Sequence, residues 1–327
     1  QLAYKSYSDN DLNTTVPLLR RAFILISIII LAASLTIPSK AGQIKAQPRK
    51  KIIPTYADVS YGPSNANKLD FWQVKSGKPA PLLVFIHGGG FRGGSKNSVP
   101  RELLMKCLEA GIACASIDYR LSGEAIYPAQ MHDSARAIQF IRSKAAEWNI
   151  DPKRVAAGGG SAGSGISQWL GFHDNLASPT SDDPIARQST RLTAVLALNM
   201  QSTYDPRQIK NIVPGRAYDH PALKQLFGLP RDWNWLEAQI DGKLDTGLKD
   251  VSPITHLTKD DPPVFILHYA ANNKDGNIHH PNFGKHLKKA MDALGIECVR
   301  KMDTDFKSRN EQYAAQVKFL KKHFGIQ

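Results

Sequence analysis

A serine in a glycine-rich turn is the strongest chemical signal in this sequence. The turn, Gly159-Gly160-Ser161-Ala162-Gly163, stands between a short apolar run ending at Ala157 and an apolar stretch beginning at Ile166. A serine on so sharp a strand-to-helix turn is held in strained backbone geometry, with its hydroxyl projecting over the sheet edge. The following helix directs amide N–H groups at the reacting oxygen. These features predict Ser161 as a nucleophile and the Ala162 amide as a donor to a developing oxyanion.

A second glycine-rich loop follows another apolar run. His87-Gly88-Gly89-Gly90-Phe91 comes directly after Leu82–Ile86. Its glycines let backbone amides approach a substrate oxygen with no Cβ in the way. We expect His87 to be structural, bonding within its own loop. Two such loops in this order, each after a buried strand, predict acyl-transfer chemistry.

Apolar runs without alternation predict the strands that carry these loops. Such runs are typical of strands covered on both faces. Helical periodicity fills the intervals between them, and this alternation implies crossover units and a mainly parallel central sheet with helices on both faces. An antiparallel hairpin is expected first, at 57–61 and 68–74. The predicted strands are 82–86, 112–117, 155–157, 192–198 and 264–267, with one more beginning near Glu297, and the clearest helical patterns are 131–141, 283–294 and 313–324.

One interval interrupts the alternation. Residues 200–262 separate two predicted strands and hold several aromatic residues among prolines and charges. We interpret this insertion before the penultimate strand as a cap or pocket wall over the carboxyl ends of the strands, where ligands bind in open α/β sheets. The alternative is that its aromatics only pack the insertion onto the body.

Short motifs between Leu82 and Leu170 together resemble one known family. They are His87–Phe91, Asp118–Leu121, Tyr127–Ala129, Asp133, Asp151–Pro152, Arg154–Val155 and Gly158–Gly163. On these motifs the chain resembles the hormone-sensitive-lipase-like esterases of the α/β-hydrolase superfamily, and it departs from them at Gly123, where those enzymes usually have proline. The resemblance implies that Ser161 is the nucleophile and that the amides of Gly88, Gly89 and Ala162 form the oxyanion hole.

The expected catalytic histidine is missing from its usual place. The resemblance puts an acid after the strand at 264–267, where Asp275 fits the local spacing, and a histidine after the last strand. That last segment, 302–306, reads Met-Asp-Thr-Asp-Phe and contains no histidine. A serine hydroxyl needs a neighbouring base to take its proton. The remaining candidates are His279 and His280.

Two interpretations of His279 and His280 are open. In the first, one of them is a relocated base, oriented by Asp303 or Asp305. In the second, the pair caps a helix or lines the pocket. His268 ends its strand and is expected to pack beneath the site, and five other histidines, His132, His173, His220, His256 and His286, are expected on helices or the surface. No metal-binding motif is found, so the sequence predicts neither a metal nor a cofactor.

The first 41 residues predict export. Arg20-Arg21 precede an apolar run at 22–35, and Ser39-Lys40-Ala41 resembles a signal-peptidase site. Cleavage would leave a single α/β-hydrolase domain at 42–327, secreted or periplasmic, with no stable membrane anchor; an uncleaved anchor is the alternative. The three cysteines are expected to be buried thiols. The net charge of +13 in 327 residues accompanies no nucleic-acid motif, so we expect a solvated basic surface.

Two functions from different classes fit these observations. The first is an exported serine hydrolase acting on carboxylic esters, with a small-molecule or polysaccharide-linked ester as substrate. The second is a binding protein on the same fold, without a working triad, because fold alone does not establish chemistry. A histidine within hydrogen-bond distance of Ser161 would favour the enzyme.

Overall fold

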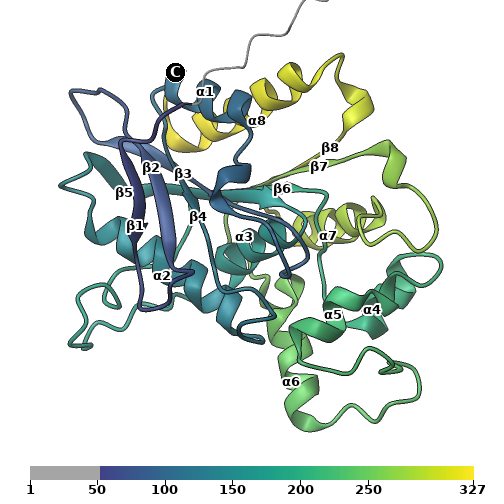
Figure 1. The fold of residues 1–327 in the computed structure, drawn as a ribbon. Helices are drawn as coiled ribbons and strands as arrows, with labels where there is room; N and C mark the ends of the chain where they lie inside the picture. Colours follow the sequence, from purple (N-terminus) through teal and green to yellow (C-terminus); the bar gives the residue numbers. More distant parts are fainter. Residues whose placement is uncertain (1–51) are drawn as a thin grey trace, which may run out of the picture. The chain divides into compact units, whose positions relative to one another are not determined.

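Eight strands form one sheet in the order β1-β2-β4-β3-β5-β6-β7-β8 in the computed structural model, which describes residues 52–327 (Figure 1). The predicted export signal at 1–41 lies outside the described residues. The strands are β1 (Tyr56–Ser60), β2 (Lys68–Trp72), β3 (Ala80–Ile86), β4 (Ala113–Ile117), β5 (Ile150–Gly160), β6 (Ala194–Leu198), β7 (Val264–His268) and β8 (Cys298–Met302).

The pairing of the strands confirms the expected α/β-hydrolase architecture. From β4 to β8 every neighbouring pair is parallel, while β1 pairs with β2 and β2 with β4 in antiparallel fashion. All seven residues of β3 are buried, as its unbroken apolar run predicts. The carboxyl ends of β3 and β5 therefore lie side by side, and these ends carry the two glycine-rich loops.

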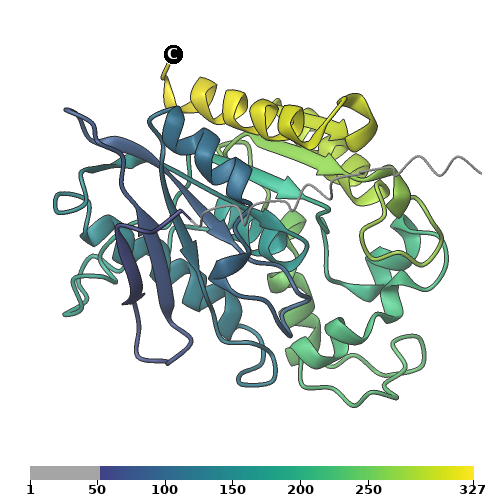
Figure 2. The same ribbon diagram turned by 45° about the horizontal axis from the view of Figure 1, so that its top comes forward.

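Helices cover both faces of the sheet and enclose two cores (Figures 1 and 2). On one face, α1 (Arg101–Glu109) lies beside α8 (Arg309–Phe324). On the other face lie α2 (Ala129–Ser143), α3 (Ala162–Phe172) and α7 (Asn282–Ala293). Burying a large apolar side chain stabilises the fold by about 1.5–3 kcal/mol, so both cores contribute substantially. The three cysteines are buried and free, which confirms their prediction as thiols.

The residues between β6 and β7 form the insertion as a group of short helices. Asp205 accepts a hydrogen bond from the Arg207 amide and so caps the first of them, with Pro206 in the favoured first position. Asp241 caps the last α-helix in the same way through the Leu244 amide. The helices are α4 (Pro206–Ile212), α5 (Pro221–Leu226) and α6 (Gly242–Val251), with 3₁₀ turns at Ala217–Asp219 and Pro253–His256.

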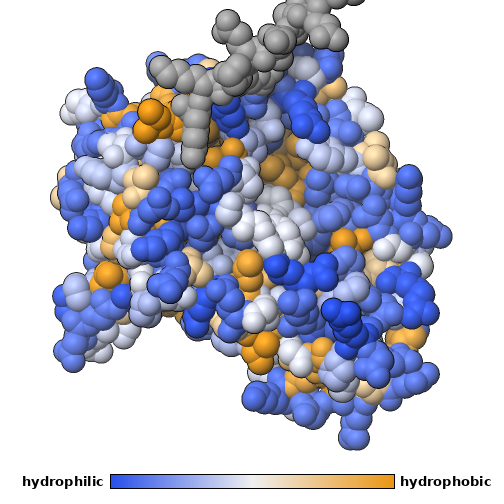
Figure 3. All heavy atoms as spheres, viewed as in Figure 1, coloured by the Kyte–Doolittle hydropathy of each residue, from blue (hydrophilic) through white to orange (hydrophobic). Residues whose placement is uncertain are grey.

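The remaining 3₁₀ turns lie outside the insertion. Further 3₁₀ turns lie at Lys96–Ser98, Ala270–Asn272 and Asp303–Asp305. On the face shown in Figure 3, hydrophilic residues predominate and hydrophobic ones form separate small patches. Within residues 52–327, no helix has the length and apolar character needed to span a bilayer.

Candidate active site

Ser161 occupies a strained turn between β5 and α3. Its backbone angles are φ 53° and ψ −121°, and its amide donates to the carbonyl oxygen of Leu198 at 2.8 Å. A Cβ atom added to Gly159 or Gly163 would lie 2.1 or 2.0 Å from the carbonyl oxygen of Ile86. The turn can therefore pack against the end of β3 only because both positions are glycine. This packing holds the serine side chain above the edge of the sheet.

The loop at 87–91 is held by its own histidine. The His87 ring is 1% exposed, and its Nδ1 lies 2.8 Å from the carbonyl oxygen of Gly88. The ring stacks on Tyr119 at 4.2 Å, and the Tyr119 hydroxyl donates to the His87 carbonyl at 2.9 Å. Burial lowers the pKa of His87, which keeps its ring neutral. The expectation that His87 is structural is confirmed.

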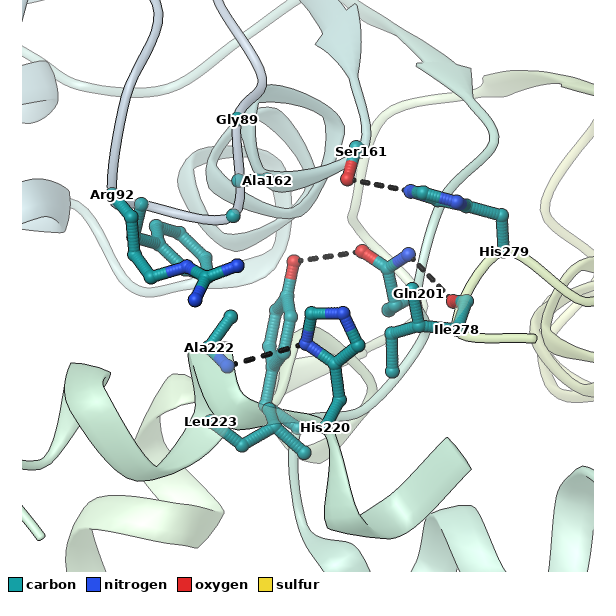
Figure 4. A pocket seen from close by; sticks show the side chains of 13 residues that line it. Gly89, Arg92, Ser161, Ala162, Gln201, His220, Ala222, Leu223, Ile278 and His279 are labelled. Atoms are coloured by element: carbon teal, nitrogen blue, oxygen red, sulfur yellow. Dashed lines mark hydrogen bonds between the residues drawn. The ribbon is translucent and has the colours of Figure 1, made fainter. Parts of the chain in front are cut away.

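The glycines of this loop lie against the serine turn. A Cβ on Gly88 would be 3.5 Å from the Cβ of Ser161, and Gly89 has φ 108°, a conformation that strains other residues. Within residues 52–327, the amides of Gly89 and Ala162 donate to no protein acceptor. Both residues line the same pocket as Ser161 (Figure 4). These amides are therefore available to a substrate oxygen.

His279 is the histidine that the structure brings to Ser161. Its Nε2 lies 2.8 Å from Ser161 Oγ, across 118 positions of sequence (Figure 4). The loop after β7 carries it over the sheet edge from the side opposite the oxyanion loop. Burial, with a smaller contribution from His220, lowers the pKa of His279. A neutral imidazole at this distance can accept the serine proton.

The backbone of His279 is anchored on both sides. Its amide donates to Oδ1 of Asn277 at 2.8 Å, and its carbonyl oxygen lies 3.1 Å from Nδ1 of His268. Asn277 in turn donates to the side chain of Asn272 at 3.4 Å. His268 is fully buried at the end of β7, and burial lowers its pKa to about 4, so it is neutral and donates from Nδ1. The prediction that His268 packs beneath the site is confirmed.

His280 does not reach the serine. Its side chain is buried, and its Nδ1 accepts a hydrogen bond from the Asn282 amide at 3.1 Å, at the start of α7. The two adjacent histidines thus point in different directions: one lines the pocket and the other caps a helix. The sequence did not separate them, and the structure removes His280 as a candidate base.

The carboxylates expected near the base lie elsewhere. Asp275 is exposed, because its loop is drawn toward the insertion by the bond from the Gly276 amide to the Pro214 carbonyl at 2.7 Å. Asp303 accepts from the Ala270 amide at 2.7 Å, and Asp305 from the Met302 amide at 3.0 Å. Within residues 52–327, no carboxylate forms a hydrogen bond or ion pair with His279. The structure therefore places neither Asp275 nor the two later aspartates as an orienting acid.

The pocket in front of Ser161 is partly walled by the insertion. Its volume is about 410 Å³. Tyr204 donates to Gln201 at 3.2 Å, and Gln201 donates to the Ile278 carbonyl at 2.8 Å, so the insertion is tied to the loop of the base. Arg92 and His220 also face the cavity (Figure 4).

Sequence reasoning missed several of these lining residues. His220 was expected on a helix or at the surface, but it lies in the pocket wall, where its Nδ1 accepts a hydrogen bond from the Ala222 amide at 3.2 Å. Arg92 and Gln201 carried no motif at all. The only signal in the sequence was the aromatic-rich insertion before the penultimate strand. It indicated a pocket wall but did not show which side chains line the pocket.

Comparison with known proteins shows that the chain is similar to ester hydrolases. Residues 69–281 match the BD-FAE protein family. The chain is 30% identical over 220 residues to the probable carboxylic ester hydrolase LipM of Mycobacterium tuberculosis, covering 64% of this chain and 46% of LipM. It is 28% identical over 229 residues to the esterase LipQ of the same organism, covering 68% and 50%. The chain thus spans about half the length of these curated relatives.

A solved structure supports the fold independently. A truncated carbohydrate esterase from gut microbiota superposes with a TM-score of 0.64 at 24% identity, covering 83% of this chain and 96% of that one. At this identity the likeness concerns the fold.

Proposed function

The chain belongs to the BD-FAE family of α/β-hydrolases, and the resemblance to hormone-sensitive-lipase-like esterases is confirmed; from this premise we propose that it hydrolyses carboxylic esters. In this proposal Ser161 is the nucleophile, His279 is the general base, and the amides of Gly88, Gly89 and Ala162 form the oxyanion hole. The observation that carries it is the distance of 2.8 Å between His279 Nε2 and Ser161 Oγ.

The proposed reaction proceeds through an acyl-enzyme. Nε2 of His279 takes the Ser161 proton while Oγ attacks the ester carbonyl, and the oxygen that becomes negative is held by the free amides. The tetrahedral intermediate collapses, and the departing alkoxide takes the proton from His279 and leaves as the alcohol. Water then attacks the acyl group, again giving its proton to His279. The acid departs, and Ser161 recovers its proton.

Among residues 52–327, no carboxylate orients the proposed base. In serine hydrolases the acid holds the imidazole in the correct tautomer and stabilises the imidazolium. In this protein, hydrogen bonds to the backbone amide and carbonyl of His279 hold its position instead. We therefore expect turnover below that of a complete triad, because the transient imidazolium lacks a compensating negative charge.

The pocket favours an ester with a compact acyl group. It combines apolar walls from Phe91, Leu223 and Ile278 with polar groups from Arg92 and His220. Its volume of about 410 Å³ is at the small end of ligand sites. We propose a small-molecule or polysaccharide-linked ester as substrate and no cofactor in the reaction. Nitrophenyl acetate and nitrophenyl octanoate, compared side by side, test the size limit, with acetate preferred.

A fluorophosphonate probe tests the proposal directly. The probe reacts with activated serines, so the wild-type protein should be labelled at Ser161, as identified by peptide mass spectrometry. Ser161→Ala is the matched control and should remain unlabelled. A folded wild-type protein that stays unlabelled, and that hydrolyses no nitrophenyl ester, would support the alternative of a binding protein without a working catalytic centre.

We also propose that the protein is exported. The proposal rests on Arg20-Arg21, the apolar run at 22–35 and the small residues ending at Ala41. Mature protein from the native host should begin near Gly42 and be secreted or periplasmic. N-terminal sequencing decides this, and recovery of the uncleaved chain in membranes would favour an anchor instead.

A further inference from the structure

Three metal-binding side chains meet at the end of α3 that is remote from Ser161. His173 follows the last residue of α3, Asp250 lies in α6, and His256 lies in the turn at 253–256. His173 Nε2 is 3.7 Å from Asp250 Oδ1, and His256 Nε2 is 3.5 Å from the same oxygen. One ligand atom from each residue can be chosen so that all lie within 4.8 Å of one another.

We propose that His173, Asp250 and His256 bind a zinc ion. Zinc is bound by imidazole nitrogen and carboxylate oxygen at about 2.0–2.2 Å in tetrahedral geometry, which separates neighbouring ligand atoms by roughly 3.4 Å. The two separations from Asp250 Oδ1 are close to this value. Two imidazoles with one carboxylate favour zinc over calcium or magnesium, which take oxygen ligands. A fourth position is left for water.

The surroundings already orient these ligands. Nδ1 of His173 lies 3.0 Å from the Asp174 carbonyl and can donate to it, so Nε2, which faces Asp250, is the nitrogen that binds the ion after releasing its proton to solvent. The other carboxylate oxygen of Asp250 accepts a hydrogen bond from the Tyr127 hydroxyl, which leaves Oδ1 for the ion. Hydrogen bonds of this kind, made by the atom that does not touch the metal, are typical of metal ligands.

His256 needs one exchange of partners. Its Nε2 lies 2.7 Å from the backbone carbonyl of Asp250. On zinc binding Nε2 releases its proton to solvent and Nδ1 takes one up from solvent, so the neutral ring changes tautomer and the lone pair of Nε2 turns to the ion. The Asp250 carbonyl keeps a second donor, because Trp169 Nε1 donates to it at 2.8 Å. Zinc binding therefore leaves no buried acceptor unpaired.

The position of the cluster defines its role. The 11 residues of α3 separate it from Ser161, and at 1.5 Å per residue this is roughly 17 Å. The ion would not touch the ester. It would instead fasten the end of α3 to α6 and to the turn at 253–256, both parts of the insertion whose other segments line the substrate pocket. We infer a stabilising site rather than a catalytic one.

Zinc titration of the untagged, chelator-treated protein tests this first. Residues 1–86 contain no histidine, so the leader adds no competing imidazole. Calorimetry should show one equivalent bound, and the Tm should rise with zinc and return on chelation. Co²⁺ should give the visible absorption of a tetrahedral complex and quench tryptophan emission, because the Trp169 ring lies 4.3 Å from the His173 ring. Absence of binding would overturn the proposal.

Variants locate the site. His173→Ala and His256→Ala should each weaken zinc binding by more than about 100-fold, and Tyr127→Phe, which removes only a supporting bond, by roughly 10-fold. His323→Ala is the matched control and should bind zinc as wild type does, since His323 lies on α8, away from the cluster, and pairs with Glu297. Unchanged binding in both alanine variants of the cluster would contradict the assignment.

A measurement on the wild-type protein covers the case in which these variants fail to fold. Diethyl pyrocarbonate modifies accessible histidines, and zinc ligation blocks the reaction. One equivalent of zinc should lower the modification of His173 and His256, mapped by mass spectrometry, while the extent of modification of His323 should not depend on zinc. If His173 and His256 are modified to the same extent with and without zinc, the proposal is overturned. These zinc measurements do not depend on ester hydrolysis. A protein that hydrolyses no ester could still bind zinc at this site, so failure of the proposed function and failure of the zinc proposal can be distinguished.

Discussion

At the ends of β3 and β5 the candidate site consists of the Ser161 side chain and backbone amides, whereas beyond β7 it consists of one side chain on a long loop. The first region depends on glycines that touch neighbouring carbonyls, such as Gly163 against Ile86. The second region depends on the position of one atom, His279 Nε2, which lies 2.8 Å from Ser161 Oγ. Loops of different length and sequence can place a nitrogen atom there. Backbone donors therefore restrict the residue types at several neighbouring positions, whereas a general base restricts only the position of one nitrogen atom.

The end of β8 shows the same contrast. The resemblance to hormone-sensitive-lipase-like esterases implies a histidine after this strand, but here Asp303 occupies the segment and accepts a hydrogen bond from the Ala270 amide at 2.7 Å. Asp303, in the segment where the histidine was expected, thus stabilises the start of the loop that follows β7. That loop carries His279 to the serine from its far end.

A large effect on turnover is expected from a single added methyl group in the backbone region. Gly163→Ala would put a Cβ 2.0 Å from the Ile86 carbonyl, which overpacks the turn at a cost of about 1–3 kcal/mol and moves the Ala162 amide. Nitrophenyl acetate turnover should fall by at least about 100-fold, as when an oxyanion donor is lost. Gly160→Ala is the matched control, because its Cβ meets nothing nearer than 4.0 Å. An equal loss of turnover in both variants would contradict the role given to the contact between Gly163 and Ile86.

A pH-dependent effect on stability is expected at His268. Burial lowers its pKa to about 4 in the folded protein, against 6.5 when unfolded, so the unfolded chain binds the extra proton between these values. Above pH 6.5 the ring is neutral in both states and does not lower the free energy of unfolding. As the pH falls from 6.5 toward 4, protonation of the unfolded chain lowers the free energy of unfolding by about 3 kcal/mol. Urea unfolding of wild type and His268→Gln at pH 7 and 4.5 measures it. Parallel losses in both proteins would contradict the assignment.

A smaller effect is expected where the loop is anchored. Asn277→Ala removes the acceptor of the His279 amide, a neutral hydrogen bond that stabilises by about 1 kcal/mol. The kcat should fall roughly tenfold with KM unchanged, because the base is displaced while the pocket remains. Asn277→Asp keeps the acceptor and should recover most of the activity. A change confined to KM would show that Asn277 serves substrate binding instead.

The smallest effect concerns the pH profile. Because burial and His220 lower the pKa of His279, the acid limb of kcat/KM should lie below pH 6.5. His220→Asn keeps an acceptor for the Ala222 amide but removes the neighbouring charge, so the limb should move upward. An acid limb above pH 6.5 in the wild-type enzyme would show that another group sets the rate.

Much of the fold could be predicted because its signals are local. Apolar runs marked the parallel strands, and the turn glycines marked the serine and the oxyanion loop. The start of β5 was missed, since Asp151, Lys153 and Arg154 are exposed or half-buried within a strand that begins at Ile150. Polar residues at the open end of a strand hide it from a hydrophobicity pattern.

The base could be narrowed to two residues but no further. His279 and His280 are adjacent, and the direction of each ring depends on Asn277, His268 and the start of α7, which no sequence pattern reveals. Asp275 matched the spacing of an acid, yet the bond from Gly276 to Pro214 turns its loop outward. Loop geometry of this kind is set by contacts between distant segments.

The pair of adjacent histidines offers the most direct test of the central claim. His279→Ala should lower kcat for nitrophenyl acetate by about 10,000-fold or more, matching Ser161→Ala, because the serine then has no base. His280→Ala, with folding checked by circular dichroism, should retain most of its turnover, since that ring only caps α7. If His279→Ala turns over as wild type does while Ser161→Ala is inactive, His279 is not the base and the account fails.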